Sequence, residues 1–180
     1  VVGLIYGLTS GLLQQNMAAP AQPVADGSNP LFGAVCATAF ASQLDPTIEE
    51  INDIKAAVSE AVTNAIVHAY KGRNGEDKIL IECAGETTDG YGGVLHIKIT
   101  DYGCGIEDVE KALVPFYTTL ADEERSGMGF TIMQTFTDNF SLKSEKGVGT
   151  VVELVKKVGS ETLCAEGIDA ANQEKERLNA

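Results

Sequence analysis

The segment Glu60-Ala-Val-Thr-Asn64-Ala-Ile-Val-His68-Ala-Tyr70 is the most informative stretch of this chain. Its pattern is helical, and a helix places Glu60, Asn64 and His68 on one face at i, i+4 and i+8. A carboxylate one turn before a carboxamide sets a proton acceptor beside an oxygen that can coordinate a metal ion. His68 is expected to make a structural hydrogen bond rather than a catalytic contact.

The residues before this segment predict one long helix that runs from Thr47 to Tyr70. Thr47-Ile-Glu-Glu50 is a capping-box pattern, in which two side chains satisfy backbone N–H groups at a helix start. Lys71-Gly72 is expected to end the helix. The stripe expected to face the core consists of Ile51, Ile54, Val58, Val62 and Ile66.

A first glycine motif, Asp101-Tyr-Gly103-Cys-Gly105-Ile106, follows a predicted strand. A carboxylate at a strand end can point into a cleft and accept a hydrogen bond from an exocyclic amine such as adenine N6. Gly103 and Gly105 allow unusual backbone angles and leave room for a flat base. Alone, such a turn is common and equally typical of a structural loop.

A second glycine motif, Ser126-Gly127-Met128-Gly129-Phe130, precedes a predicted helix. Backbone N–H groups and a helix N-terminus converge there, which suits phosphate oxygens. Glycine before a helix can also serve packing alone. The chain contains no G-x-x-x-x-G-K-[ST] motif, so a P-loop is excluded as the phosphate site.

The polar loop from Tyr117 to Arg125 ends directly at the second glycine motif. It could close over a bound nucleotide, with Arg125 neutralising charge on a γ-phosphate. Thr118 and Thr119 could donate hydrogen bonds to phosphate or simply stabilise the loop. The alternative for Arg125 is an exposed residue with a packed stem.

The remaining pattern predicts an α/β two-layer sandwich, with helices on one face of a mixed, mostly antiparallel sheet. We expect an N-terminal extension and weak edge strand in residues 1–30, one domain in residues 31–157 and a tail in residues 158–180. Residues 1–16 are interpreted as the extension and residues 17–30 as the edge strand. The further elements are expected as helices over 31–44, 107–113 and 131–137 and strands over 78–84, 94–100, 140–144 and 150–156.

Composition narrows the function. A net charge of −13 over 180 residues argues against direct binding to nucleic acid and favours a protein partner. No membrane span or signal peptide is expected, since residues 1–25 carry no charge and their apolar run is short. The cysteines form no C-x-x-C pair and predict free thiols in a reducing cytoplasm.

Together and in this order, the three motifs resemble the ATPase superfamily shared by gyrase, Hsp90, sensor histidine kinases and the bacterial anti-sigma serine kinases. Residues 59–70 and 124–133 are particularly similar to the anti-sigma F factor group, and the similarity covers about residues 32–157. The resemblance implies a cytoplasmic, homodimeric protein that binds and inhibits a sporulation sigma factor. It also implies a kinase that uses Mg²⁺ and ATP to phosphorylate a serine of an anti-anti-sigma protein.

The resemblance also implies roles for residues. Glu60 would be the catalytic base, with Glu124 as an open alternative, and Arg125 would assist transfer. Asn64 would be the metal ligand. The residues implied in nucleotide binding are Asn64, Asp101, Gly103, Gly105, Thr118, Thr119, Ser126, Gly127, Met128 and Gly129.

The chain departs from the family at two places. Gly33, Ala34 and Val35 follow Phe32, where the family often carries an arginine that engages partners. Leu120 replaces a lysine often found in the lid. A nucleotide-regulated binding module without phosphotransfer is the main alternative function. A sensor histidine kinase would need a phospho-accepting histidine on an upstream helical hairpin, and the first histidine printed is His68.

Overall fold

The computed structural model describes residues 3–7, 30–70, 78–87, 92–117 and 126–159. The strands are β1 Gly3–Gly7, β2 Lys78–Thr87, β3 Gly93–Asp101, β4 Asn139–Glu145 and β5 Gly149–Val158. They form one sheet in the order β1-β2-β3-β5-β4. β1 runs parallel to β2, and the other neighbouring pairs are antiparallel. The predicted mixed, mostly antiparallel sheet is therefore confirmed.

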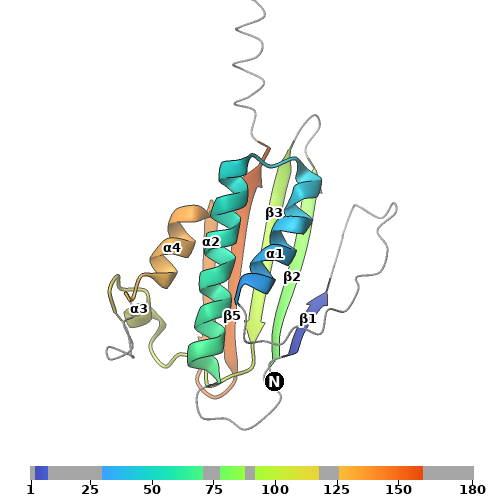
Figure 1. Cartoon of the computed structure of the whole chain (residues 1–180). Coiled ribbons are helices and arrows are strands. Elements are labelled where there is room, and N and C mark those ends of the chain that lie inside the picture. Colours follow the sequence, from blue (N-terminus) through green and yellow to red (C-terminus); the bar gives the residue numbers. More distant parts are fainter. Residues whose placement is uncertain (1–2, 8–29, 71–77, 88–91, 118–125, 160–180) are drawn as a thin grey trace, which may run out of the picture.

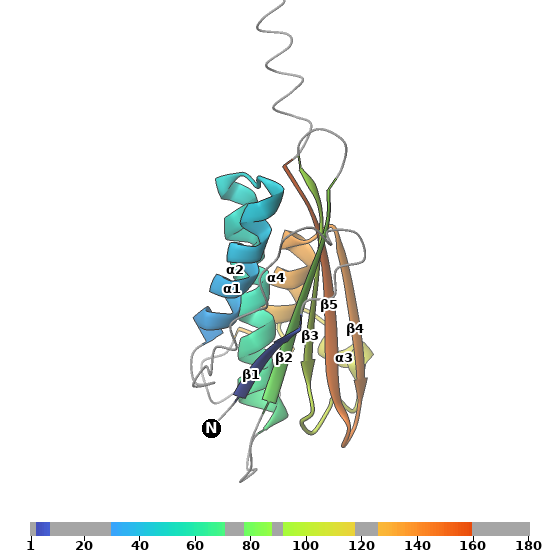
Figure 2. The same cartoon turned by 90° about the vertical axis from the view of Figure 1, so that its right-hand side faces the viewer.

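The α-helices are α1 Pro30–Ala41, α2 Ile48–Asn64, α3 Val109–Ala112 and α4 Gly129–Phe136. A 3₁₀ turn, Ser42–Leu44, follows α1, and a π-helical turn, Ala65–Ala69, extends α2. Helices α1, α2 and α4 cover one face of the sheet, as the edge-on view of Figure 2 shows, while α3 contacts β4. The two-layer α/β sandwich is confirmed, and each element predicted from residue 31 onward is present within a few residues of its expected bounds.

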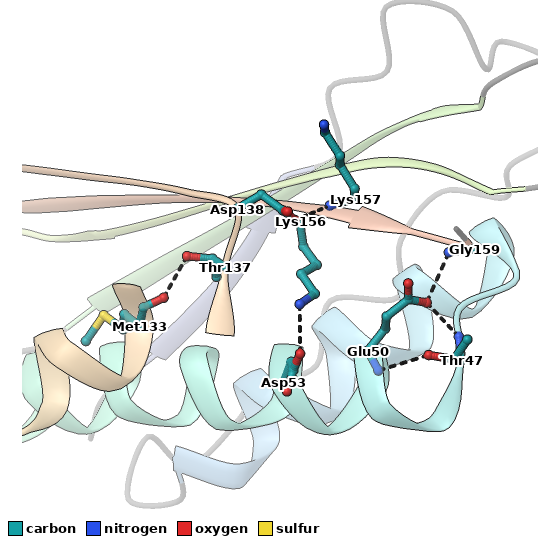
Figure 3. A network of polar contacts seen from close by, with 9 residues as sticks. All are labelled: Thr47, Glu50, Asp53, Met133, Thr137, Asp138, Lys156, Lys157 and Gly159. Atoms are coloured by element: carbon teal, nitrogen blue, oxygen red, sulfur yellow. Dashed lines mark hydrogen bonds and ion pairs between the residues drawn. The ribbon is translucent and has the colours of Figure 1, made fainter. Parts of the chain in front are cut away.

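Helix α2 begins at the predicted capping box. The Thr47 hydroxyl accepts the Glu50 N–H at 3.2 Å, and Glu50 Oε2 accepts the Thr47 N–H at 2.7 Å. Glu50 Oε2 also accepts the N–H of Gly159 at 3.0 Å, so one carboxylate caps the helix and fixes the end of β5 (Figure 3). A cap of this kind contributes about 1 kcal/mol.

The core lies between α2 and the sheet. Ile54, Val58 and Val62 of the predicted stripe are fully buried, and Ile51 and Ile66 pack partly buried against them. At the edge of this layer Lys156 of β5 reaches Asp53 of α2, with Nζ and Oδ2 2.7 Å apart (Figure 3). The Lys156 side chain is only 16% exposed, and its ammonium bridges the two layers.

Gly33 marks where α1 lies closest to its neighbours. A Cβ there would come within 2.7 Å of Ile81 Cδ1 and 3.0 Å of Val62 Cγ2. A large side chain at this position would therefore collide with the core. A side chain at position 33 would need Ile81 and Val62 to shift, which favours glycine where α1 packs on α2 and β2.

The N-terminal region differs from expectation. Residues 1–16 were expected to be an extension, but β1, Gly3–Gly7, pairs with β2 from Gly3 opposite Lys78 to Gly7 opposite Glu82. Ile5 and Tyr6 are strand-forming residues, and the flanking glycines allow the pairing to end. The edge strand expected within residues 17–30 lies almost wholly outside the described residues. So does the tail expected over residues 158–180, of which only Val158, the last residue of β5, and Gly159 are described. In the described part of the chain, no helix is both long and apolar enough to cross a membrane.

Candidate functional site

A cleft of about 1280 Å³ opens between the C-terminal part of α2, the loop after β3 and the start of α4. These three segments lie far apart in the sequence, as the colours of Figure 1 show. All three motifs contribute to its wall. The predicted site residues that line it are Glu60, Asn64, Asp101, Gly105, Ser126, Gly127, Met128 and Gly129, together with His68.

The end of α2 holds the first wall of the cleft. Glu60 and Asn64 lie on its last turns, and the helix then widens into the π-helical turn that contains His68. Such turns insert an extra residue into a helix and often occur at functional sites. The carbonyl of Ala69, at the end of this turn, accepts the N–H of Cys104 at 2.8 Å.

The first glycine motif is pressed against this turn. A Cβ on Gly103 would lie 2.3 Å from the Ala69 oxygen and 2.4 Å from the Ala69 Cβ, so only glycine fits. The thiol of Cys104 lies 3.2 Å from the carbonyl oxygen of His68. The predicted role of Gly103 in shaping the pocket is thus consistent with close backbone packing, although Gly103 itself does not line the cleft.

Asp101 ends β3 and is 7% exposed. Its Oδ1 accepts the N–H groups of Gly103 at 2.9 Å and Thr150 at 3.2 Å. Burial raises the pKa of the Asp101 carboxyl, and hydrogen bonds from Gly103 and from the backbone and hydroxyl of Thr150 oppose that shift. The carboxylate is therefore a fixed, largely dehydrated acceptor at one end of the cleft.

Gly105 fastens the loop after β3 to the β4–β5 hairpin. Its φ of +67° is left-handed, and a Cβ would lie 2.0 Å from the Glu145 carbonyl oxygen. The next N–H, that of Ile106, donates to Ser144 Oγ at 2.8 Å. These contacts hold the loop in one conformation.

At the opposite end of the cleft, the N-terminus of α4 lies on α2. A Cβ on Gly129 would come within 3.0 Å of Glu60 Oε2 and 3.1 Å of Asn64 Nδ2. No side chain caps α4, and the Met128 N–H contacts Ser126 Oγ at 3.3 Å. The unsatisfied first-turn N–H groups and the helix dipole favour an anion here.

Phe116 and Gly127 flank the loop that is predicted to act as a lid, and they are hydrogen-bonded to each other. The Phe116 N–H donates to the Gly127 carbonyl at 3.0 Å, and both residues are left-handed, with φ of +67° and +65°. Phe116 is 73% exposed, which is unusual for a bulky residue with positive φ. The neighbouring Tyr117 lines the cleft, and Lys111 Nζ lies 5.1 Å from the centre of its ring. Thr118, Thr119, Arg125 and the alternative base Glu124 lie outside the described residues.

Sequence reasoning did not identify Thr150 or Ser144 as site residues. Thr150 lines the cleft and bonds to Asp101, and Ser144 bonds to Thr150. The sequence pattern offered only a weak indication, and only for Thr150. Thr150, Val152 and Leu154 alternate on one face of a strand, so a polar residue at the first of these positions stands out against two apolar ones.

The arrangement combines a buried hydrogen-bond acceptor at Asp101 with a helix N-terminus, at the start of α4, that favours an anion. Glu60 and Asn64 lie beside the anion site and supply two oxygen-bearing groups. Among the described residues no cluster of three or more His, Cys, Asp or Glu side chains could hold a metal ion. A carboxylate and a carboxamide suit Mg²⁺, which keeps several waters and shares phosphate oxygens.

Comparison with known proteins identifies the family of this chain. Residues 34–156 match the histidine kinase-like ATPase domain family. The anti-sigma F factor of Thermoanaerobacter sp. (strain X514) is 49% identical over 133 residues, which are 74% of this chain and 88% of that protein. The anti-sigma F factor of Clostridium botulinum (strain Eklund 17B / Type B) is 51% identical over 136 residues, 74% of this chain and 90% of that protein.

Histidine kinase domains are among the solved structures that align with this chain. The catalytic domain of histidine kinase ThkA aligns at 21% identity with a TM-score of 0.44, over 60% of this chain and 69% of that one. The blue-light activated histidine kinase of Erythrobacter litoralis EL346 aligns at 22% identity with a TM-score of 0.45, over 67% and 34%. From the family match and the relatives of about half-identical sequence, this chain belongs to the histidine kinase-like ATPase domain family and, within it, to the anti-sigma F factors.

Proposed function

We propose that the cleft binds Mg-ATP and transfers its γ-phosphoryl group to a serine of a protein partner. The observation that carries this proposal is the contact of Gly129 with both Glu60 and Asn64. It brings the N-terminus of α4, which favours an anion, beside a carboxylate and a carboxamide, an arrangement that suits phosphoryl transfer. ATP-binding ability is the shared property of the family to which the chain belongs.

The end of the cleft at Asp101, here called the base end, would recognise adenine. The Asp101 carboxylate would accept a hydrogen bond from the exocyclic amine, and the glycines of the first motif would let the flat ring approach the backbone. The triphosphate would then extend toward Ser126, Gly127, Met128 and Gly129. Backbone N–H groups at the start of α4 would bind its oxygens.

Asn64 is the residue that would hold Mg²⁺ in this arrangement. Its carboxamide lies beside Gly129 and therefore beside the site proposed for phosphate. When bound, the ion would neutralise phosphate charge and orient the γ-phosphoryl group. One protein oxygen suits a metal whose other ligands are waters and phosphate.

Glu60 would remove the proton of the attacking hydroxyl. The serine oxygen forms a bond to the γ-phosphorus while the bond from that phosphorus to the β–γ bridging oxygen breaks, which leaves ADP. The hydroxyl proton passes to a Glu60 carboxylate oxygen, whose place beside Gly129 supports this role. Arg125, Thr118 and Thr119 would complete the phosphate site when the lid closes, and Glu124 is the alternative base.

The partners follow from the relatives. Because those relatives bear the name anti-sigma F factor, we assign to this chain the binding and inhibition of a sporulation sigma factor in the cytoplasm, as a homodimer. The serine to be phosphorylated would belong to an anti-anti-sigma protein. A net charge of −13 is compatible with protein partners and unfavourable for nucleic acid.

The test is phosphate transfer from γ-labelled Mg-ATP to the anti-anti-sigma protein. We expect label on one serine of that protein, and none when this serine is replaced by alanine. Glu60→Gln should bind Mg-ATP like the parent and lose at least about 100-fold in transfer rate. Glu49→Gln, an exposed change on the same helix, is the matched control and should transfer normally. Tight nucleotide binding without any transfer would favour a nucleotide-regulated binding module instead.

A further inference from the structure

Carboxylates outnumber lysines along the cleft. Among the described residues that line it, the carboxylates are Glu60, Asp101, Glu107 and Asp108, and the lysines are Lys111 and Lys146. A nucleoside triphosphate is a polyanion, and carboxylates in a cleft with low-dielectric walls repel it. The proposed binding of Mg-ATP therefore depends on cations that can face its phosphates.

The two lysines differ in what they contact. Lys146 Nζ lies 2.8 Å from Glu107 Oε2, and this ion pair largely neutralises both side chains. Lys111 forms no ion pair with any residue that the structure describes. Asp108 Oδ1 accepts the backbone N–H of Lys111 at 2.9 Å, as the cap of α3, and not its ammonium. Lys111 therefore brings a positive charge to the cleft that no described carboxylate neutralises.

Tyr117 links the Lys111 ammonium to the second glycine motif. Lys111 Nζ lies 5.1 Å from the centre of the Tyr117 ring, within the range of a cation–π contact. This contact uses the face of the ring and leaves ammonium N–H donors for a further partner. The backbone of Tyr117 lies against Gly127, because a Cβ on Gly127 would come within 2.8 Å of the Tyr117 carbonyl oxygen. The cation is thus attached to the loop that leads into the start of α4.

We propose that Lys111 is a phosphate-binding residue, whose ammonium contacts the polyphosphate of the nucleotide in the cleft. This inference rests on the proposed function, because it assumes that the phosphates lie at the second glycine motif. A lysine suits this role as a compact charge with three donors. Lys111 is an exposed residue, so water screens its charge and limits the size of the effect.

The experiment compares a nucleoside with its triphosphate on the full 180-residue chain. Calorimetry measures the affinity for Mg-ATP, and competition against Mg-ATP measures the affinity for adenosine. Lys111→Gln should weaken Mg-ATP about fivefold, at the upper end of the range for an exposed ion pair, and leave adenosine unchanged. Lys111→Arg keeps the charge and should bind Mg-ATP within about twofold of the parent. Added salt should reduce the difference between the parent and Lys111→Gln.

Lys143→Gln is the matched control, because Lys143 lies on β4 outside the cleft and pairs with Glu153 at 3.2 Å. It removes the same charge and should leave both affinities unchanged. No loss of Mg-ATP affinity in Lys111→Gln, an equal loss for adenosine, or an equal loss in Lys143→Gln would overturn the role of Lys111 and leave the proposed function standing. A parent protein that does not bind Mg-ATP would overturn the proposed function and this inference with it.

Discussion

At the base end of the cleft Asp101 is buried and bonded to the backbone of β5 and of the loop after β3, whereas at the phosphate end Phe116 is exposed on a left-handed backbone. Glycines occur at both ends, for different reasons. Gly105 is enclosed by the backbone of the β4–β5 hairpin, while Gly129 faces the ends of the Glu60 and Asn64 side chains. Backbone cannot move away from an added methyl group, but side-chain ends can.

This contrast indicates a division of labour along the cleft. The base end is built into the sheet, so changes there should affect folding and recognition together. The phosphate end is a junction between α4 and a loop, so changes there should affect ligand binding more than stability. The predictions below test this division, beginning with the largest effect.

Gly105→Ala should cost about 3 kcal/mol of unfolding free energy. The left-handed φ of Gly105 penalises any Cβ by about 1–2 kcal/mol, and the 2.0 Å approach to the Glu145 oxygen adds an overpacking cost of similar size. Gly147→Ala is the matched control, because Gly147 has φ of +82° and nothing within 4 Å of a built Cβ. It should lose only about 1 kcal/mol. Chemical denaturation measures both, and equal losses would show that the hairpin does not enclose Gly105.

Gly129→Ala should leave stability within about 1 kcal/mol of the parent, since alanine favours a helix and the contacts at 3.0–3.3 Å involve side-chain ends. The methyl group should displace Glu60 and Asn64 and weaken Mg-ATP binding about tenfold. Denaturation and Mg-ATP titration on the same variant separate the two effects. A large loss of stability with normal binding would contradict the division between the two ends.

Acid should weaken ATP binding through Asp101. Because burial raises the pKa of the Asp101 carboxyl, protonation begins at a higher pH than for an ordinary aspartate. Protonation replaces the charged acceptor for the adenine amine by a weaker neutral one. ATP affinity should therefore fall as pH falls through that raised pKa. Asp101→Asn is the control, because its ATP affinity should be weaker and should lack the part of the pH dependence that comes from Asp101. The two proteins would be titrated in parallel, and identical pH profiles would remove Asp101 from base recognition.

The same shift affects the unliganded protein in the opposite direction. Between the ordinary and the raised pKa, the unfolded chain binds fewer protons at Asp101 than the folded chain does. The contribution of Asp101 to unfolding free energy therefore decreases as pH rises through this window. Comparison with Asp101→Asn isolates that contribution from those of other carboxyl groups.

Local patterns in the sequence were sufficient for most of the fold and for the motif order. The apolar stripe and the Thr47–Glu50 box act within one helix, so they can be interpreted without knowing any neighbour. The π-helical turn at Ala65–Ala69 could not be predicted, because its residues fit an ordinary helix and only the contact with Cys104 shows its purpose.

The row formed by Asp101, Thr150 and Ser144 was missed for a different reason. It depends on the register of three strands, which is set by the hairpin at Glu145–Gly149 and by pairing across some fifty residues of chain. β1 was missed in the same way, since its partner β2 lies far along the sequence. Non-local pairing was thus the main limit on prediction.

Phe116→Gly should change stability only modestly, from no effect to a gain of about 1.5 kcal/mol. Glycine relieves about 1–2 kcal/mol of left-handed strain, while its greater freedom in the unfolded chain costs about 0.5–1 kcal/mol. The exposed ring gives up little burial. Val114→Gly, at an exposed neighbour whose φ is not positive, should instead lose about 0.5–1 kcal/mol. If both variants lose the same unfolding free energy, the backbone at Phe116 and Gly127 is not strained. The phosphate end would then be as relaxed as the base end.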